Sequence, residues 1–183
     1  MKKVLSLVLA GSMVLSLAAC GGSKDTTTTT DSSAASSTEA AGSDTFKIGG
    51  TGPITGGAAI YGNAVKNGIQ IAVDEINEAG GINGYQIDYN FQDDEHDAEK
   101  AVNAYNNLKD WGMQVLIGTT TSAPCIAVVE KSHADNMFQI TPSGTAVECV
   151  QYDNAYRMCF SDPTQGTESA KYIGENGMAQ KVA

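Results

Sequence analysis

The chain has 183 residues, a formal net charge of −10 and only 11 Lys and Arg residues. Nucleic-acid binding needs clustered Lys and Arg, so this composition argues against a nucleic-acid partner. The acidity does not point to an anionic substrate either, because an anion site would have to be built locally. No CxxC or Cys/His spacing is present, and we expect neither a metal nor a cofactor.

The N-terminus carries the pattern of an export signal. A basic start precedes the apolar run Val4–Leu17, which is too short to span a bilayer comfortably, since that takes about 20 residues. The stretch LAAC, Leu17–Cys20, resembles the lipobox of bacterial lipoproteins. We therefore predict a signal peptide over residues 1–19 and a lipid on Cys20. The alternatives are an ordinary signal cut near Ala19 or an uncleaved anchor.

Residues 20–45 read as a flexible tether. Gly21–Asp44 is almost purely Gly, Ser, Thr, Ala and Asp, and it holds no side chain large enough to build a core. Such a segment behind a lipidated cysteine would let a domain work at the extracytoplasmic face of a bacterial cell membrane. Without the signal peptide, which holds two lysines, the net charge becomes −12.

Three thiols remain once Cys20 is assigned to lipid: Cys125, Cys149 and Cys159. Disulfides are permitted outside the cytoplasm, so one pair and one free thiol are expected. The sequence does not fix the pairing. Cys149 and Cys159 flank a turn-like QYDN, which makes a hairpin-scale bridge one possibility.

Strands and helices alternate from Phe46 onward. We predict strands at 46–50, 85–92, 114–118, 137–141 and 155–160, with the start of another at 181–183. Helices are predicted at 61–81, 97–112, 124–136 and 163–177, the second with Asp97 as a candidate cap. The first helix has one apolar face, formed by Val65, Ile69, Ala72, Val73 and Ile76. The expected fold is an α/β, Rossmann-like parallel sheet flanked by helices.

Ligands bind such sheets beyond the carboxyl ends of the strands, so the loops there are the candidate sites. The loop 51–61 is glycine-rich, but its spacing and Pro53 fit a dinucleotide fingerprint badly. The acidic loop Asp93–Asp97 could be a metal or paired-carboxylate site, although a solvated strand end with a helix cap explains it more simply. A serine hydrolase built on Ser122, His133 and Asp135 lacks the Gly-x-Ser-x-Gly elbow.

Two hydroxyl-rich loops precede helices: TTTSAP at 119–124 and TPSGTAVE at 141–148. Free backbone N–H groups and the positive end of a helix dipole favour an anion there, and hydroxyls add donors. Helix capping by Ser122 and Thr145 is the alternative for each loop alone. Together the two loops favour recognition of a carboxylate.

Four stretches in order carry a family resemblance: residues 46–102, VLIGTTTSAP, ITPSGTA and FSDPTQG. The chain resembles the substrate-binding receptors of branched-chain amino acid ABC transporters, which are periplasmic binding proteins of the Leu/Ile/Val type. The resemblance implies a non-enzymatic receptor that binds an amino acid and delivers it to a membrane permease. Other members bind other amino acids, amides and small acids, so the ligand stays open.

The resemblance also implies a set of ligand-binding residues. Ser122 would bind the ligand carboxylate through its N–H and hydroxyl, with Thr145 contributing similarly. A backbone carbonyl at Ser143 would receive the ammonium, and Tyr61 would close over the ligand. Some members join the positions of His96 and Thr121 by a disulfide, whose cysteines are absent here. The predicted set is Tyr61, Thr121, Ser122, Ser143, Gly144 and Thr145.

Members of this family are two-lobed, which implies a ligand-binding first lobe over 46–161 and a hinge crossing into a second lobe over 162–183. We expect the chain to be a fragment that stops after the first lobe, to lack the selectivity pocket and to bind amino acids weakly on its own. An extracellular ligand sensor of the same fold is the alternative, and a surface serine hydrolase is a further one.

Overall fold

The computed structural model describes residues 45–179 and Lys181, and its centre is one parallel sheet. The strands are β1 (Phe46–Gly52), β2 (Ile87–Asp93), β3 (Val115–Ile117), β4 (Gln139–Thr141) and β5 (Ala155–Arg157). They lie in the order β2-β1-β3-β4-β5, and every pairing is parallel. The chain order reverses between β1 and β3, which is where such sheets bind ligands. The predicted α/β fold is confirmed.

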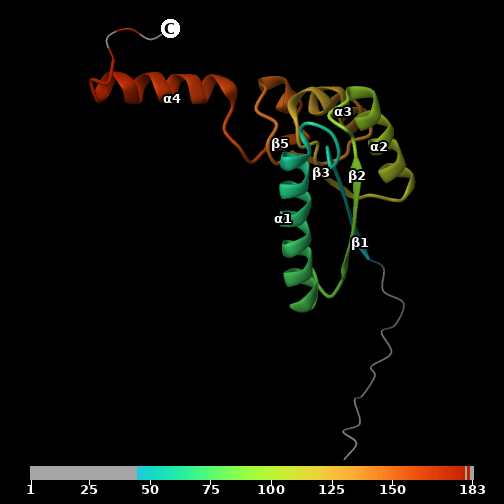
Figure 1. Cartoon of the computed structure of the whole chain (residues 1–183). Helices are drawn as coiled ribbons and strands as arrows, with labels where there is room; N and C mark the ends of the chain where they lie inside the picture. Colours follow the sequence, from blue (N-terminus) through green and yellow to red (C-terminus); the bar gives the residue numbers. More distant parts are fainter. Residues whose placement is uncertain (1–44, 180, 182–183) are drawn as a thin grey trace, which may run out of the picture. The chain divides into compact units, whose positions relative to one another are not determined.

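Helices cover both faces of this sheet (Figure 1). They are α1 (Ala59–Glu78), α2 (Ala98–Asp110), α3 (Ser122–Ala134) and α4 (Asp162–Glu175), with a 3-10 turn, η1 (Val147–Val150). Helix α1 packs on β1 and β2 through a small core of Ile48, Val73 and Ile87. Helices α2 and α3 pack on the opposite face, around Tyr105, Leu108, Leu116 and Val128. Helix α4 has no buried residue.

Local sequence explains why α2 sits where it does. The Asp97 side chain accepts a hydrogen bond from the Lys100 N–H at 2.9 Å, so the predicted cap is confirmed. Ala101, Tyr105 and Leu108 follow at helical spacing and are fully buried. Gly49 of β1 faces this layer, where a Cβ would lie 2.1 Å from Met113 Sδ. The absence of a side chain at Gly49 therefore lets this layer approach the sheet closely.

The predicted inner face of α1 is only partly correct. Val73 is buried, but Ala72 and Ile76 are exposed, and Val65 and Ile69 are half-buried. The reason lies in the sheet: α1 covers β1 and β2 but leaves the neighbouring strands open on that face. The second predicted strand also begins too early, since β2 starts at Ile87.

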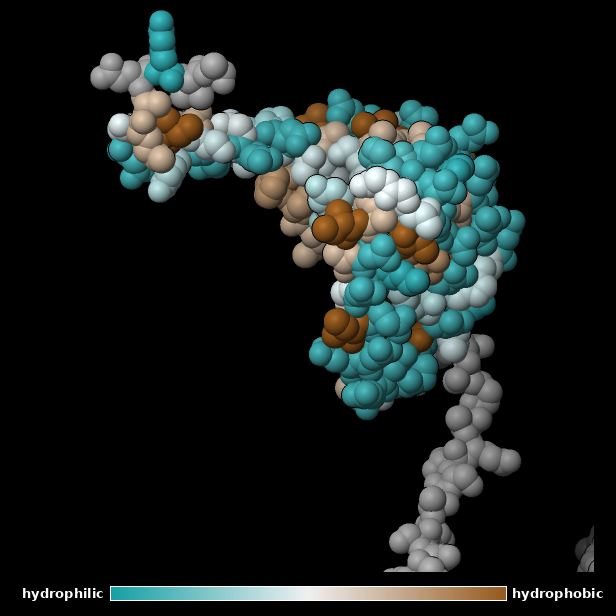
Figure 2. All heavy atoms as spheres, in the orientation of Figure 1, coloured by the Kyte–Doolittle hydropathy of each residue, from teal (hydrophilic) through white to brown (hydrophobic). Residues whose placement is uncertain are grey.

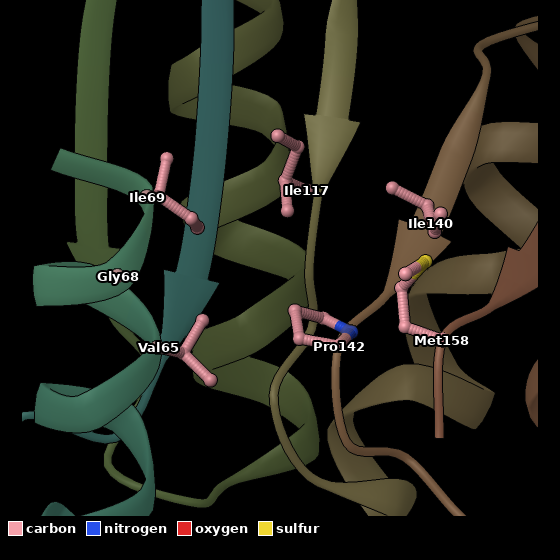
Figure 3. A pocket seen from close by; sticks show the side chains of 7 residues that line it. All are labelled: Val65, Gly68, Ile69, Ile117, Ile140, Pro142 and Met158. Carbon is pink, nitrogen blue, oxygen red and sulfur yellow. The ribbon is translucent and has the colours of Figure 1, made fainter. Parts of the chain in front are cut away.

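The open face is apolar. Ile117 of β3 and Ile140 of β4 line a groove of about 260 Å³ with Pro142, Met158 and the α1 residues Val65, Gly68 and Ile69 (Figure 3). Beside it, the rings of Phe138 and Tyr156 stack with centroids 5.3 Å apart, and both are about half exposed. Figure 2 shows strongly apolar residues reaching the surface as separate patches among polar ones.

Some predictions fall outside the described residues. These are the signal peptide over 1–19, the lipidated Cys20, most of the tether over 20–45, and most of the strand expected at 181–183. Within the described residues, no helix combines the length and the apolar character needed to cross a membrane. The turn η1 was not predicted, because its four residues VECV show no helical period.

Candidate ligand-binding site

A cavity of about 700 Å³ lies where the hydroxyl-rich loops leave β3 and β4. Five of the six predicted residues line it: Tyr61, Thr121, Ser122, Ser143 and Thr145. Gly144 does not line it; this residue is buried, and its N–H donates to Thr141 Oγ1 at 2.9 Å. A Cβ on Gly144 would lie 2.7 Å from that same oxygen, so its role here is to let the loop pack closely.

The four consecutive hydroxyl residues 119–122 divide into a buried pair, Thr119 and Thr120, and a partly exposed pair, Thr121 and Ser122. Thr119 and Thr120 are fully buried. The Thr120 hydroxyl and N–H both donate to the Thr51 carbonyl at 3.1 Å, which ties the loop to the end of β1. Thr121 and Ser122 follow and reach the cavity, so a buried anchor places them there.

Ser122 joins the two loops. Its Oγ accepts hydrogen bonds from the N–H groups of Thr145 at 3.1 Å and Ala146 at 3.3 Å. The capping alternative is wrong for both Ser122 and Thr145: α3 has Thr121 as its N-cap with no side-chain capping bond, and η1 begins after Ala146. With its oxygen accepting, the Ser122 hydroxyl keeps its own proton for another partner.

Backbone donors converge on the same place. The N–H groups of Ser122 and Ala123 belong to the first turn of α3, where a helix offers them no partner of its own. These N–H groups form the positive end of the helix dipole. On the facing loop, Arg157 Nη1 donates to the carbonyls of Thr145 at 3.0 Å and Ala146 at 2.9 Å. Arg157 is the only arginine of the chain, and it fixes the second loop from beneath.

The acidic loop contributes a residue that the sequence did not single out for the cavity. His96 lines the cavity, and its Nδ1 lies 2.9 Å from Thr121 Oγ1. These are the two positions that the family resemblance connects by a disulfide in some members. Here a hydrogen bond joins them instead.

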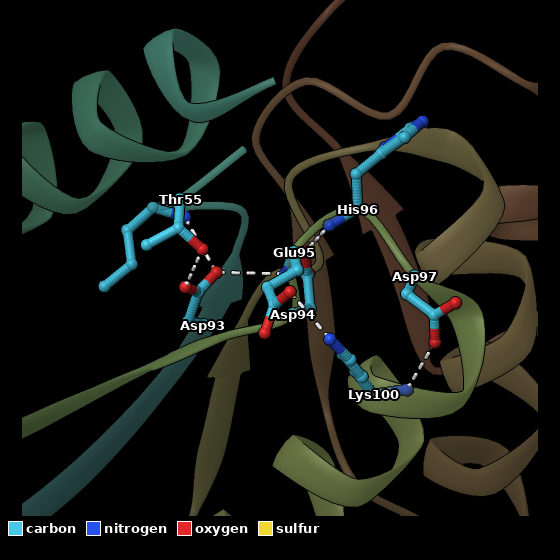
Figure 4. Close-up of polar contacts among 8 residues, drawn as sticks. Thr55, Asp93, Asp94, Glu95, His96, Asp97 and Lys100 are labelled. Atoms are coloured by element: carbon cyan, nitrogen blue, oxygen red, sulfur yellow. Dashed lines mark hydrogen bonds and ion pairs between the residues drawn. The ribbon is translucent and has the colours of Figure 1, made fainter. Parts of the chain in front are cut away.

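Figure 4 shows why the other residues of the acidic loop are not a metal site. Asp93 accepts from the Ile54 N–H, the Thr55 hydroxyl and the Glu95 N–H, and Glu95 pairs with Lys100. The carboxylates are thus engaged separately. Among the described residues, no group of three or more His, Cys, Asp or Glu side chains is placed to hold a metal ion.

Two neighbouring carboxyl groups of this loop have opposite pKa shifts. Burial raises the pKa of Asp94 to about 6, although the His96 N–H donates to it, and its Oδ2 has no partner among the described residues. Burial also raises the pKa of Asp93, but hydrogen bonds from Thr55, Ile54 and Glu95 outweigh it and lower that pKa overall. Asp94 is thus a buried carboxyl group at the base of the loop that holds His96.

The residues of a hydrolase triad are not assembled. The His133 ring stacks on Tyr152 at 4.2 Å, and its Nδ1 lies 3.7 Å from Asp153. Asp135 instead accepts from the Tyr105 hydroxyl at 2.9 Å. The partners of Ser122 Oγ are instead the N–H groups of Thr145 and Ala146.

Sequence reasoning missed five residues of the cavity: His96, Thr120, Ala123, Cys159 and Phe160. Ala123 and Thr120 could have been predicted, because they flank predicted residues in the same loop. Phe160 lies three residues beyond the end of β5 and is 56% exposed, although it is a large apolar side chain. It supplies an apolar part of the cavity lining.

Comparison with known proteins decides the family. Residues 45–183 match the family model of the periplasmic binding proteins. The chain belongs to this family. The chain is 36% identical over 138 residues to the Leu/Ile/Val-binding protein BraC3 of Rhizobium johnstonii, and the match covers 74% of this chain and 38% of that protein. It is 32% identical to a leucine-, isoleucine-, valine-, threonine- and alanine-binding protein of Pseudomonas aeruginosa, covering 77% of this chain and 38% of that one.

A solved structure agrees. The branched-chain amino acid transporter substrate-binding protein LivJ of Streptococcus pneumoniae, in complex with isoleucine, is 33% identical with a TM-score of 0.68. The match covers 72% of this chain and 38% of LivJ. The chain therefore spans about two fifths of the length of these relatives. The relatives are binding proteins rather than enzymes, which confirms the non-enzymatic class, and the family works outside the cytoplasm.

Proposed function

We propose that this chain is the carboxylate-binding part of an extracytoplasmic amino acid receptor that delivers a branched-chain amino acid to an ABC transporter permease. The observation that carries the proposal is the convergence of donors on one cavity: the α3 N-terminal N–H groups, the Ser122 hydroxyl and the hydroxyls of Thr121 and Thr145. A carboxylate is the anion that these neutral donors suit, because no lysine or arginine is among the described residues that line the cavity.

The six residues named from the sequence take distinct parts in this proposal. Ser122 and Thr145 bind the carboxylate, a carbonyl near Ser143 accepts from the ammonium group, and Tyr61 and Phe160 cover the aliphatic side chain. Thr121 orients its loop through His96, and Gly144 allows the second loop to turn closely beneath the ligand. Both relatives are named for binding leucine, isoleucine and valine, which supports an aliphatic side chain, although the second is also named for binding threonine and alanine.

The described residues supply only part of the free energy of binding. A charge at a helix N-terminus contributes about 0.3–1 kcal/mol, and a hydrogen bond to a charged group about 1.5–3 kcal/mol. Micromolar affinity needs about 8 kcal/mol. We therefore expect millimolar binding to this chain, with α4 from Asp162 onward serving as the crossing to a second lobe that closes over the ligand. A lipid on Cys20 would keep the receptor at the membrane.

Ligand-detected NMR tests the proposal at these weak affinities. Isoleucine, leucine and valine should show saturable binding to the 183-residue chain. 2-Methylbutylamine, which keeps the aliphatic side chain and ammonium group but has no carboxylate, should show none. Equal binding of that amine would overturn the carboxylate assignment.

A variant pair localises the interaction. Ser122→Ala removes a cavity hydroxyl and should weaken isoleucine binding about tenfold, the cost of one hydrogen bond to a charged group. Thr167→Ala is the matched control, because it removes an exposed hydroxyl of α4 that lies outside the cavity. Equal affinity of the two variants would place the ligand elsewhere.

A further inference from the structure

Three cysteines lie around the second ligand loop, and two of them are in contact. Cys125 is in the first turns of α3, Cys149 is in η1, and both are fully buried. Each thiol reaches the backbone of the other's element: the Cys125 S–H donates to the Cys149 carbonyl at 3.9 Å, and the Cys149 S–H donates to the Ser122 carbonyl at 3.8 Å.

The surroundings of Cys125 favour its thiolate. Gln139 Nε2 donates to Cys125 Sγ at 3.4 Å, and the sulfur lies near the N-terminus of α3. The neighbouring Cys149 thiol, followed by the side chains of Thr119 and Thr141, lowers the pKa of Cys125, although burial opposes this effect. Thiolates at helix N-termini are the reactive ones in thiol–disulfide exchange. Cys125 is therefore the attacking sulfur of a dithiol, with Cys149 as its neighbour.

Cys159 has a different position. It is half-buried, lines the ligand cavity, and its S–H donates to the Gly144 carbonyl at 3.5 Å. Burial is the largest cause that raises its pKa. Cys149 contacts Cys125 and the first turn of α3, whereas the Cys159 thiol contacts Gly144, so a bridge from Cys149 to Cys125 is favoured over the hairpin-scale bridge to Cys159 that the sequence left open.

We propose that Cys125 and Cys149 close into an intrachain disulfide that fastens η1 to α3 beneath the ligand loops, leaving Cys159 as a thiol. The oxidant is a protein or small-molecule disulfide of the extracytoplasmic compartment, where this family works. The Cys125 thiolate attacks one sulfur of that disulfide, forms a mixed disulfide and releases a thiolate. Cys149 then attacks Cys125 Sγ, forms the intrachain bond and releases the second thiolate. The two cysteine protons end on the released thiols, and the donor disulfide gains two electrons.

The bond would act on the site through Ser122. Cys149 follows Ala146 by three residues, and the Thr145 and Ala146 N–H groups are the donors to Ser122 Oγ. A covalent link from η1 to the next turn of α3 holds these groups together. Because both sulfurs are buried, the exchange requires η1 to open from α3, while Cys125 keeps its place on α3 beside Gln139.

Tryptic mapping without reduction tests the pairing directly. Cleavage after Lys109, Lys131, Arg157 and Lys171 puts each of the three cysteines on its own peptide, 110–131, 132–157 and 158–171. In the chain exported by a bacterial host and alkylated before digestion, we expect 110–131 joined to 132–157 and an alkylated Cys159. A link between 132–157 and 158–171, or three alkylated cysteines, would overturn the proposal.

A stability measurement separates a bond from a chance pairing. Reduction with dithiothreitol should lower the melting temperature of the exported chain by roughly 10 °C, because the bond closes a loop of 24 residues. Cys159→Ser, the matched control, should keep this shift, and Cys149→Ala should lose it. A shift that survives Cys149→Ala would refute the assignment even if the variant is less stable overall.

Discussion

The buried carboxyl group of Asp94 lowers the stability of the folded lobe at neutral pH. Its side chain has no exposed surface, and burial raises its pKa from 3.8 to about 6. A folded-state pKa above the unfolded value means that the folded state holds an extra proton between these two values. Stability therefore falls as pH rises through this window, and the full loss at pH 7 is about 3 kcal/mol.

Substitution of Asp94 by Asn removes the charge and keeps the shape. The amide oxygen can still accept from the His96 N–H, but the amide nitrogen takes the place of Oδ2, which has no partner among the described residues. An unsatisfied buried donor costs about 1–3 kcal/mol, which offsets part or all of the roughly 3 kcal/mol gained, so we expect a net gain of about 0–2 kcal/mol at pH 7. Below about pH 4 only the cost of the donor should remain, and Asp94→Asn should be less stable than wild type, because the wild-type carboxyl group is then mostly neutral in both states.

Urea unfolding between pH 4 and pH 8 measures this difference. Asp88→Asn is the matched control, because it removes an exposed carboxylate from the same strand, β2. The stability of Asp94→Asn relative to wild type should rise with pH, while that of the control should stay flat. A relative stability of Asp94→Asn that does not change with pH would refute the reasoning.

Two further perturbations follow from the fold. Asp97→Ala removes the cap of α2 and should lower the free energy of unfolding by about 1 kcal/mol in urea titrations, whereas Asp97→Ser should stay close to wild type; equal losses would argue against the capping bond. Met158→Gln places a polar side chain in the open apolar groove and should reduce both the fluorescence of a hydrophobic dye and self-association in ultracentrifugation, since large exposed apolar faces promote association. Unchanged dye binding would mean that the groove is not accessible in solution.

The order of the elements could be predicted because apolar residues repeat with different spacings in strands and in helices. Alternating short apolar runs and helical stretches specify a parallel sheet, and the two hydroxyl loops follow β3 and β4, which are neighbours in the sheet. Ser122 and Thr145 therefore had to lie near each other. The bond between them, from the Thr145 N–H to Ser122 Oγ, depends on the path of the second loop, which a sequence pattern does not contain.

The contribution of His96 could not be predicted for a conformational reason. Glu95 and His96 both have positive φ, 49° and 62°, a left-handed turn that residues other than glycine seldom adopt. This turn brings His96 to Thr121, whereas an ordinary strand end would have left it solvated. The prediction of a buried α1 face was partly wrong for a different reason. Burial of that face depends on what covers β3 to β5, and the sequence of α1 holds no information about this.

The most direct test of the account is amide chemical-shift mapping of the ¹⁵N-labelled chain during titration with isoleucine. The carboxylate-binding cavity predicts saturable shifts at Ser122, Ala123 and Thr145, with small changes at the far end of α1. It also predicts that 2-methylbutylamine leaves these amides unmoved. Saturable shifts confined to the apolar groove around Ile140, with Ser122 and Thr145 unchanged, would contradict the account.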